Sequence, residues 1–409
     1  MRVSVDIDRL GLQGDGIAEG PLFAPRTLPG ETVSGVVDGT QLTDIRIETP
    51  SEHRVQAPCR HYKACGGCQL QHADGAFVAD WKLGVVRQAL DAQGLQTDLR
   101  PIHTSPARSR RRATLAARRT KKGALVGFHG RATDVITEVP DCQLLQPELM
   151  QALPLAEELA ILGASRKTAL AVTITSSEQG LDVLVRHGKP LDGPLRMQLA
   201  PLVERYDLAR LSWEEELIAM DPPPTQSFGA AQVCPPAGSF LQATHDGEAA
   251  LLAAVQEVVQ GAGRIIDLFA GCGTFSLPLA KQAEVHAVEG DDAMMLALDT
   301  GWRKAQGLKK VTTETRDLFR RPVLPDELTP FGKPFEAVVI DPPRAGAEAQ
   351  VAELTKARVP IIAYVSCNPV TFARDAKALV SAGYSLNWVQ TVDQFRWSTH
   401  TELAASFTL

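Results

Sequence analysis

The chain has 409 residues, enough for two or three domains, and its hydrophobic fraction of 44% and charged fraction of 22% are ordinary for a soluble globular protein. The first residues contain no apolar core of signal-peptide length and no apolar run could span a bilayer, so we expect a cytoplasmic protein with no membrane partner. The net charge of −6 argues against polyanion binding over the whole surface, although the distribution of charge matters more than its sum.

Residues 1–56 contain short alternating apolar and polar runs, separated by Gly-Asp-Gly, Leu-Pro-Gly and Asp-Gly turns. This pattern predicts a small five-stranded barrel of the OB type. The stretches GDGIAEG at 14–20 and TLPGE at 27–31 resemble a TRAM domain, which is an RNA-binding barrel. The resemblance implies that this unit contacts RNA or serves as a spacer.

Three of the seven cysteines lie close together just after this unit: Cys59, Cys65 and Cys68 form a C-x5-C-x2-C pattern. An odd number of cysteines with a tight cluster favours metal binding or catalysis over disulfides in a reducing compartment. Cys142 is a candidate fourth ligand. Four thiolates suit either zinc or an iron–sulfur cluster, and the spacing alone does not decide between them.

A central α+β unit is predicted up to about residue 235. The segment from residue 76 to about 95 predicts an amphipathic helix with Trp81, Val85 and Leu90 on its apolar stripe. A second helix is predicted at 147–162, and the DPPP sequence at 221–224 is a candidate linker. Strands are predicted at 113–116, 124–128, 169–173 and 181–185.

The first part of this unit is strongly basic, because residues 100–131 contain no Asp or Glu. Such a local positive field can capture a nucleic-acid backbone on an otherwise acidic protein; the alternative is a solvated basic strand pair. The basic residues inside this segment are Arg108, Arg110, Arg111, Arg112, Arg118, Arg119, Lys121 and Lys122.

After about residue 238, strands and helices alternate to the end, as a doubly wound parallel sheet requires. Three predicted strands end in FAGCGT at 269–274, in DPPR at 341–344 and in CNP at 367–369. The carboxyl ends of parallel strands meet at one edge, where open α/β folds bind ligands. We therefore expect these three segments to form one site.

The first of these segments indicates the cofactor. Gly271 and Gly273 allow the main chain to approach a ligand, and the absence of a third glycine disfavours NAD. Glu289 ends the next strand, 22 residues after Asp267, where an acid typically holds ribose hydroxyls. Together with Asp341 at a further strand end, this favours S-adenosylmethionine.

The last segment indicates a nucleophile. A lone buried cysteine is usually a core thiol, but Cys367 lies at a strand end directly before Asn-Pro. A thiolate that adds to C6 of uracil makes C5 nucleophilic, and the adduct must later lose the C5 proton to a base. Glu402 is a candidate for that base, although a lone Glu is more often a solvated surface carboxylate.

These motifs together resemble the RNA uracil-5-methyltransferase family over nearly the whole chain. The pairing of DPPR at 341–344 with SCNP at 366–369 is the most specific feature, and SFLQ at 239–242 and HTE at 400–402 also match. The resemblance implies an α/β, Rossmann-like class I methyltransferase domain at 236–409. It also implies a barrel at 1–56 and a central domain at 57–235 that carries the cysteine cluster, with residues 73–103 packed on the catalytic domain.

The same resemblance implies roles for individual residues. Cys367 is the nucleophile and Glu402 the proton acceptor. The cysteine set matches members that carry a [4Fe-4S] cluster, with Cys59, Cys65, Cys68 and Cys142 as ligands. The implied contacts to S-adenosylmethionine are Gln242, Phe269, Thr274, Glu289, Asp317 and Asp341.

Two stretches depart from the family pattern. Phe395 is followed by Arg396, whereas the family usually has a proline there, and WEEE at 213–216 matches no family pattern.

The leading hypothesis is S-adenosylmethionine-dependent C5 methylation of a uridine in structured RNA by a monomer. We favour 23S ribosomal RNA, because members with both cluster and barrel more often act on it, and a tRNA target is the alternative. A different class, a redox-sensing iron–sulfur RNA-binding protein, is disfavoured by the intact Asp341, Cys367 and Glu402.

Overall fold

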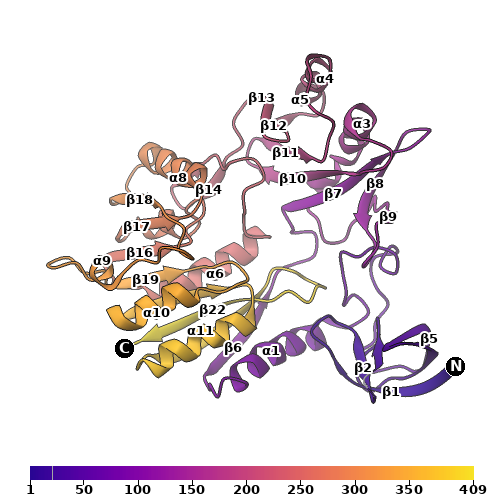
Figure 1. Ribbon diagram of the computed structural model, residues 1–409, viewed down its shortest axis with the longest axis horizontal. Helices are drawn as coiled ribbons and strands as arrows, with labels where there is room; N and C mark the ends of the chain where they lie inside the picture. Colours follow the sequence, from indigo (N-terminus) through magenta and orange to yellow (C-terminus); the bar gives the residue numbers. More distant parts are fainter. Residues whose placement is uncertain (21) are drawn as a thin grey trace.

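The computed structural model describes residues 1–20 and 22–409, which form a barrel and three sheets (Figure 1). The predicted N-terminal barrel is confirmed. It is closed in the order β1-β2-β3-β5-β4 around Ile7, Ala18, Ala24, Val33 and Leu42. Its strands are β1 (Arg2–Leu10), β2 (Gly16–Ala18), β3 (Leu22–Ala24), β4 (Thr32–Asp38) and β5 (Gln41–Thr49).

A seven-stranded sheet in the order β13-β12-β11-β10-β7-β8-β9 forms the middle of the chain. Neighbouring strands are antiparallel, except that β11 and β12 run parallel. Its strands are β7 (Arg112–Arg119), β8 (Ala124–His129), β9 (Ile136–Thr137), β10 (Leu170–Ser177), β11 (Gly180–Arg186), β12 (Leu208–Trp213) and β13 (Glu216–Met220). The accompanying helices are α2 (Pro147–Met150), α3 (Leu153–Gly163), α4 (Gly193–Leu199) and α5 (Pro201–Arg205). The single helix predicted at 147–162 is therefore two helices.

The WEEE segment at 213–216, which matches no family pattern, has a structural role in the core of this unit. Trp213 ends β12 and is fully buried, while Glu216 begins β13 after a turn. A Cβ atom at Gly163 or at Gly188 would lie 2.1 Å from the Trp213 ring, so the indole leaves no space for a side chain at either position. The segment is thus a core anchor followed by a tight exposed turn.

The C-terminal sheet has eight strands in the order β18-β17-β16-β19-β20-β22-β21-β6. The five strands from β18 to β20 are parallel, and β22 is antiparallel to both of its neighbours. The strands are β6 (Asp98–Thr104), β16 (Arg264–Leu268), β17 (Glu284–Glu289), β18 (Val311–Thr315), β19 (Ala337–Ile340), β20 (Ile361–Ser366), β21 (Ser385–Asp393) and β22 (Glu402–Thr408).

Helices cover both faces of this sheet, and alternate residues of each central strand enter two separate cores. In β20, Ile362 and Tyr364 belong to one core, and Ala363 and Val365 belong to the other. The helices are α6 (His245–Val258), α7 (Ser276–Leu279), α8 (Asp292–Lys304), α9 (Pro325–Leu328), α10 (Glu348–Ala357) and α11 (Pro369–Ser381). A hairpin of β14 (Gln226–Phe228) and β15 (Ala231–Val233) packs on α8.

Helix α1 (Gly75–Asp91) precedes the central sheet in sequence but packs on α11 (Figure 1). Strand β6 extends the C-terminal sheet beside β21. Of the predicted apolar stripe, Leu90 is buried as expected, whereas Trp81 and Val85 are only partly buried and each lies one position before a buried residue. The buried side chains are Val78, Lys82, Val86 and Leu90, so the stripe includes a lysine. No described helix has the length and hydropathy needed to cross a membrane.

Candidate active site

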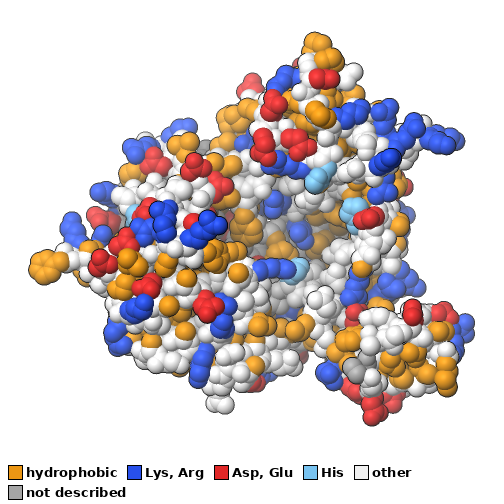
Figure 2. Space-filling view, in the orientation of Figure 1, with side chains coloured by type: hydrophobic (Ala, Val, Ile, Leu, Met, Phe, Trp, Pro, Cys, Tyr) orange, Lys and Arg blue, Asp and Glu red, His pale blue; other side chains and the backbone are white. Residues whose placement is uncertain are grey.

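A cavity of about 790 Å³ lies at the carboxyl edge of the parallel strands. Figure 2 shows the molecule hollowed between the barrel, the central sheet and the C-terminal sheet. The cavity walls come from the strand ends of the C-terminal sheet, from the cysteine loop at residues 66–69, and from the segment before β22. Three predicted site residues, Asp341, Cys367 and Glu402, line this cavity together.

Cys367 directly follows β20, and it faces two carboxyl groups. Burial raises the pKa of the Cys367 thiol to about 12, and the charges of Glu402 and Asp341 add to this effect. The Arg344 guanidinium acts in the opposite direction. Arg344 is therefore the nearby cation that favours the thiolate.

Glu402 is the first residue of β22 and is 5% exposed, which contradicts the solvated surface carboxylate considered above. Burial raises the pKa of this carboxyl to about 7, partly offset by Arg344. The pKa of Asp341 is also raised, by burial and by the charge of Glu402. A carboxyl with a pKa near neutrality is well suited to take up and release a proton.

The loop before Glu402 is held by a side chain that sequence reasoning missed. Lys82 of α1 is fully buried, and its ammonium donates to Asp393 Oδ1 at 2.6 Å. It also donates to the carbonyls of Phe395 at 3.3 Å and His400 at 2.9 Å. Such a pair is stable only with complete hydrogen bonding, and here it fixes both ends of the segment that leads into Glu402.

The opposite end of the cavity contains the predicted cofactor contacts. Glu289 accepts hydrogen bonds from the amides of Gly271 at 3.1 Å and Gly290 at 2.7 Å, and Gly271 has a φ of +55° that favours glycine. Phe269 packs against Phe319 with ring centroids 5.5 Å apart. Phe269, Glu289, Asp317 and Asp341 all line the cavity, whereas Thr274 is not among its lining residues.

Gln242 also lines the cavity, and its side chain is 2% exposed. Its amide nitrogen lies 3.4 Å from Asp341 Oδ2, and its amide oxygen accepts from Gln394 at 2.6 Å. Gln394 is a further residue that the sequence did not indicate.

Comparison with known proteins identifies the family. The chain is 42% identical to an uncharacterized RNA methyltransferase of Rhizobium meliloti, over 98% of each chain. It is 33% identical to the 23S rRNA (uracil(1939)-C(5))-methyltransferase RlmD of Shewanella piezotolerans, over 100% of this chain and 96% of that protein. This chain belongs to the RNA uracil-5-methyltransferase family. The family model described as tRNA (Uracil-5-)-methyltransferase matches residues 305–407.

As a member of the RNA uracil-5-methyltransferase family, the protein is an S-adenosylmethionine-dependent enzyme that methylates C5 of a uridine in RNA. The α/β fold is shared with a Pyrococcus abyssi tRNA (uracil-54, C5)-methyltransferase, whose structure contains S-adenosyl-L-homocysteine. The two structures superpose with a TM-score of 0.74 over 99% of each chain, at 22% identity. The family resemblance inferred from the motifs is thereby confirmed.

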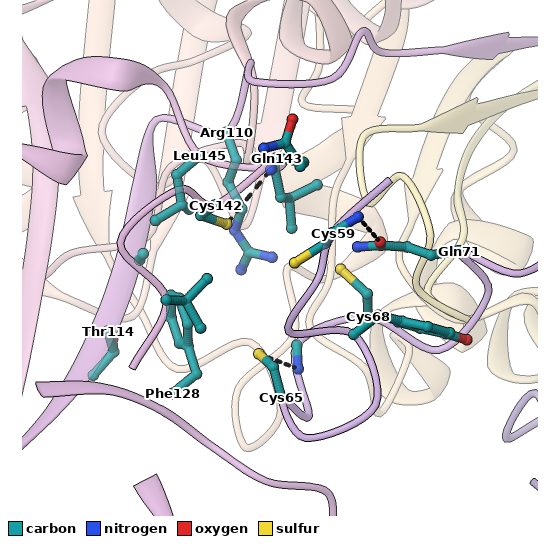
Figure 3. Close-up of a pocket in the computed structure, with 15 residues that line it drawn as sticks. Cys59, Cys65, Cys68, Gln71, Arg110, Thr114, Phe128, Cys142, Gln143 and Leu145 are labelled. Carbon is teal, nitrogen blue, oxygen red and sulfur yellow. Dashed lines mark hydrogen bonds between the residues drawn. The ribbon is translucent and has the colours of Figure 1, made fainter. Parts of the chain in front are cut away.

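The methyltransferase contains a second cavity of about 300 Å³, which borders the first. It is lined by four free cysteines, Cys59, Cys65, Cys68 and Cys142, whose thiols surround a shared space (Figure 3). Gly66 closes this loop tightly, since a Cβ there would lie 2.8 Å from the backbone of the strand β8 end. Among residues 1–20 and 22–409, no group of three or more His, Cys, Asp or Glu is arranged to hold a single metal ion.

The basic segment of the methyltransferase is only partly a surface. Arg111 is 1% exposed; it donates to the carbonyl of Gln242 at 2.9 Å and pairs with Glu248 at 2.5 Å. Arg112 donates to the carbonyl of Gly238 at 2.8 Å. Arg111 and Arg112 therefore join the central sheet to the catalytic unit, so these two arginines are not part of an exposed basic surface. Lys121 and Lys122 remain exposed between β7 and β8.

Proposed function

We propose that this enzyme methylates C5 of a uridine in 23S ribosomal RNA. The observation that carries the proposal is the match to RlmD, which extends over the whole chain at 33% identity. The archaeal tRNA enzyme of the same fold is only 22% identical, which is too distant to indicate a substrate. Lys121 and Lys122 would contact the RNA backbone, whose phosphates dominate the affinity of such complexes.

The catalytic roles follow from the cavity. S-adenosylmethionine, held by Phe269, Glu289, Asp317 and Asp341, would supply an electrophilic methyl group, and a cavity of about 790 Å³ is within the size range of ligand pockets. The target uridine has to leave its stack to reach the strand ends, which costs a few kcal/mol.

We propose that the chain is divided into a barrel at 1–56, a central domain at 57–235 and a Rossmann-like domain at 236–409.

Cys367 Sγ, as the thiolate, forms a bond to C6 of the uracil ring. The added electron pair makes C5 nucleophilic, so that C5 bonds to the methyl carbon as the carbon–sulfonium bond breaks. Glu402 then accepts the proton from C5. The electrons of that C–H bond restore the C5–C6 double bond, and the C6–S bond breaks to regenerate the thiolate and release 5-methyluridine.

The RNA target can be tested by methyl transfer in vitro. Purified enzyme with radiolabelled S-adenosylmethionine should label unmodified 23S ribosomal RNA and leave unmodified tRNA at background. Mass mapping of RNA from a deletion strain should show one ribosomal uridine without its 5-methyl group. Labelling of tRNA alone would contradict the ribosomal assignment and leave the chemistry unaffected.

We also propose that Cys59, Cys65, Cys68 and Cys142 hold a [4Fe-4S] cluster. The donor set fits, because four thiols line a cavity of about 300 Å³, and none of the described residues that line it is a His, Asp or Glu. Four thiolates spread around a cubane bind four iron atoms, so they need not converge on one ion. Resemblance to cluster-containing members of the family supports iron over zinc.

Enzyme purified without oxygen is expected to contain about four iron and four sulfide ions per chain. Cys68→Ser should reduce both to well below half, because one of four ligands is lost. Cys234→Ser is the matched control, since Cys234 is a free cysteine outside this cavity, and it should retain the full content. Zinc without sulfide in the wild-type protein would contradict the proposal.

A further inference from the structure

Two buried glutamine side chains lie in series between the backbone and the catalytic cavity. Gln394 is 1% exposed and Gln242 is 2% exposed, and only Gln242 lines the cavity. Gln394 Nε2 donates to Gln242 Oε1 at 2.6 Å, and Gln242 Nε2 lies 3.4 Å from Asp341 Oδ2. Gln394 follows β21 directly and precedes the loop that departs from the family pattern.

The direction of these hydrogen bonds is fixed by the backbone. The amide of Ala243 donates to Gln394 Oε1 at 2.8 Å, and that of Thr244 lies 3.4 Å from the same oxygen. A backbone N–H can only donate, so the oxygen of Gln394 must face it and the nitrogen must face Gln242. Gln242 must therefore accept this hydrogen bond with its side-chain oxygen. Its side-chain nitrogen is then directed to Asp341 and the cavity. The backbone donors therefore fix the orientation of both side-chain amides, which distances alone would leave ambiguous.

The position of Gln242 itself leaves little freedom. Its carbonyl accepts from Arg111 Nε at 2.9 Å, so the backbone is held from one side by Arg111 and from the other by Gln394. A Cβ atom at Gly247 would lie 2.8 Å from Gln394 Cβ, so α6 packs closely on the Gln394 side chain. Gln242 Nε2 carries two hydrogens; one is directed to Asp341 and the second is available to a ligand.

An amide nitrogen directed into the cavity would be a hydrogen-bond donor that discriminates between bases. Uracil has a carbonyl acceptor at position 4, where cytosine has an amino donor, and the C6 addition and C5 methylation are open to both rings. A site built to hydrogen-bond one such group rejects the analogue that lacks it by large factors, because its buried polar group is left without a partner.

We propose that Gln394 is a positioning residue that makes the enzyme selective for uracil, by holding the Gln242 amide so that its N–H faces the 4-carbonyl of the flipped base. Gln394 touches neither base nor cofactor and acts only through Gln242. The proposal rests on the uridine chemistry above and adds the determinant that excludes cytidine. The family resemblance implies a contact of Gln242 with S-adenosylmethionine instead, and the test separates that contact from one with the base.

The test uses an RNA hairpin with uridine or cytidine at the target position, and compares kcat/KM for the two. The variant Gln394→Leu removes the constraint on Gln242. We expect the uridine-to-cytidine ratio of kcat/KM to fall about 10- to 100-fold, the worth of one buried hydrogen bond, while the KM for S-adenosylmethionine changes little. Covalent capture with 5-fluorouridine and 5-fluorocytidine RNA should show the same loss of preference.

The control is Gln350→Leu. Gln350 is also 1% exposed and makes two hydrogen bonds, to the backbone N–H and carbonyl of Val323, but lies outside the cavity. The Gln350→Leu variant should retain the wild-type uridine-to-cytidine ratio of kcat/KM. If Gln394→Leu does not fold, Gln394→Glu, whose ionised side chain still accepts from Ala243 but cannot donate to Gln242, should show the same fall.

Equal loss for uridine and cytidine would overturn the proposal and assign Gln394 a purely structural role. A rise in the KM for S-adenosylmethionine with an unchanged ratio would overturn it in favour of a cofactor contact. Failure of the wild-type enzyme to form any 5-fluorouridine adduct would contradict the covalent mechanism instead, and so is distinguishable from both.

Discussion

Replacing Cys367 with alanine is expected to abolish methyl transfer and to abolish covalent capture of RNA that contains 5-fluorouridine. The ring fluorine cannot be removed as a proton, so an enzyme that attacks C6 remains attached to the methylated base. Wild-type enzyme should therefore give a denaturation-resistant protein–RNA band that requires S-adenosylmethionine to accumulate. In Cys367→Ala no sulfur is present at the end of β20, and the band should be absent.

The matched control for this experiment is Cys234→Ala. Cys234 is also a free, partly exposed thiol, but it does not line the catalytic cavity. This variant should form the band at the wild-type level. A band of undiminished intensity in Cys367→Ala would assign the nucleophile to another residue, since nothing else about the cavity is changed by removing one sulfur atom.

The sequence predicted the parts of this site that lie at strand ends. Asp341, Cys367 and Glu289 each follow or end a short apolar run, and the parallel sheet brings such ends to one edge. The barrel was also predictable, because its turns are marked by glycine, proline and aspartate. In both cases the determining signal is local and lies within about ten residues.

The parts that the sequence did not predict depend on contacts between distant segments. Lys82 breaks the apolar stripe of α1 in sequence, and its burial is explained only by Asp393, 311 residues away. Gln394 and Gln242 are 152 residues apart and look like ordinary polar residues. The burial of Arg111 likewise depends on Glu248, 137 residues away. Hydropathy patterns treat such residues as solvated, because the pattern contains no information about the partner.

The substitution Glu402→Gln is expected to reduce turnover by about 10²- to 10⁴-fold, the range for loss of a general base. Addition to C6 and methyl transfer precede proton removal, so this variant should accumulate a covalent complex with ordinary uridine RNA. Wild-type enzyme should show no such accumulation. A gel shift that survives denaturation, together with a mass equal to enzyme plus methylated RNA, measures this. Normal turnover by Glu402→Gln would exclude Glu402 from proton transfer.

The pH dependence provides an independent check on the same carboxyl. Burial raises the pKa of Glu402 to about 7, and the base acts when ionised, so the rate of adduct resolution in wild-type enzyme should rise through about pH 7 and then level off. Glu402→Gln should lose this inflection, whereas Glu257→Gln, at a half-exposed carboxyl that pairs with Arg100, should retain it.

Loss of stability cannot account for these effects, because ionised Glu402 destabilises the folded protein. The pKa of Glu402 is higher in the folded than in the unfolded state, so its contribution to stability is present at low pH and is lost as the pH rises through about 7. At pH 8 the wild-type protein carries a buried charge that Glu402→Gln lacks. The melting temperature of the variant should therefore equal or exceed that of the wild type at pH 8, while its turnover is lower. The same burial that raises the pKa of the carboxyl, and so makes it a suitable base, makes its ionised form unfavourable for folding.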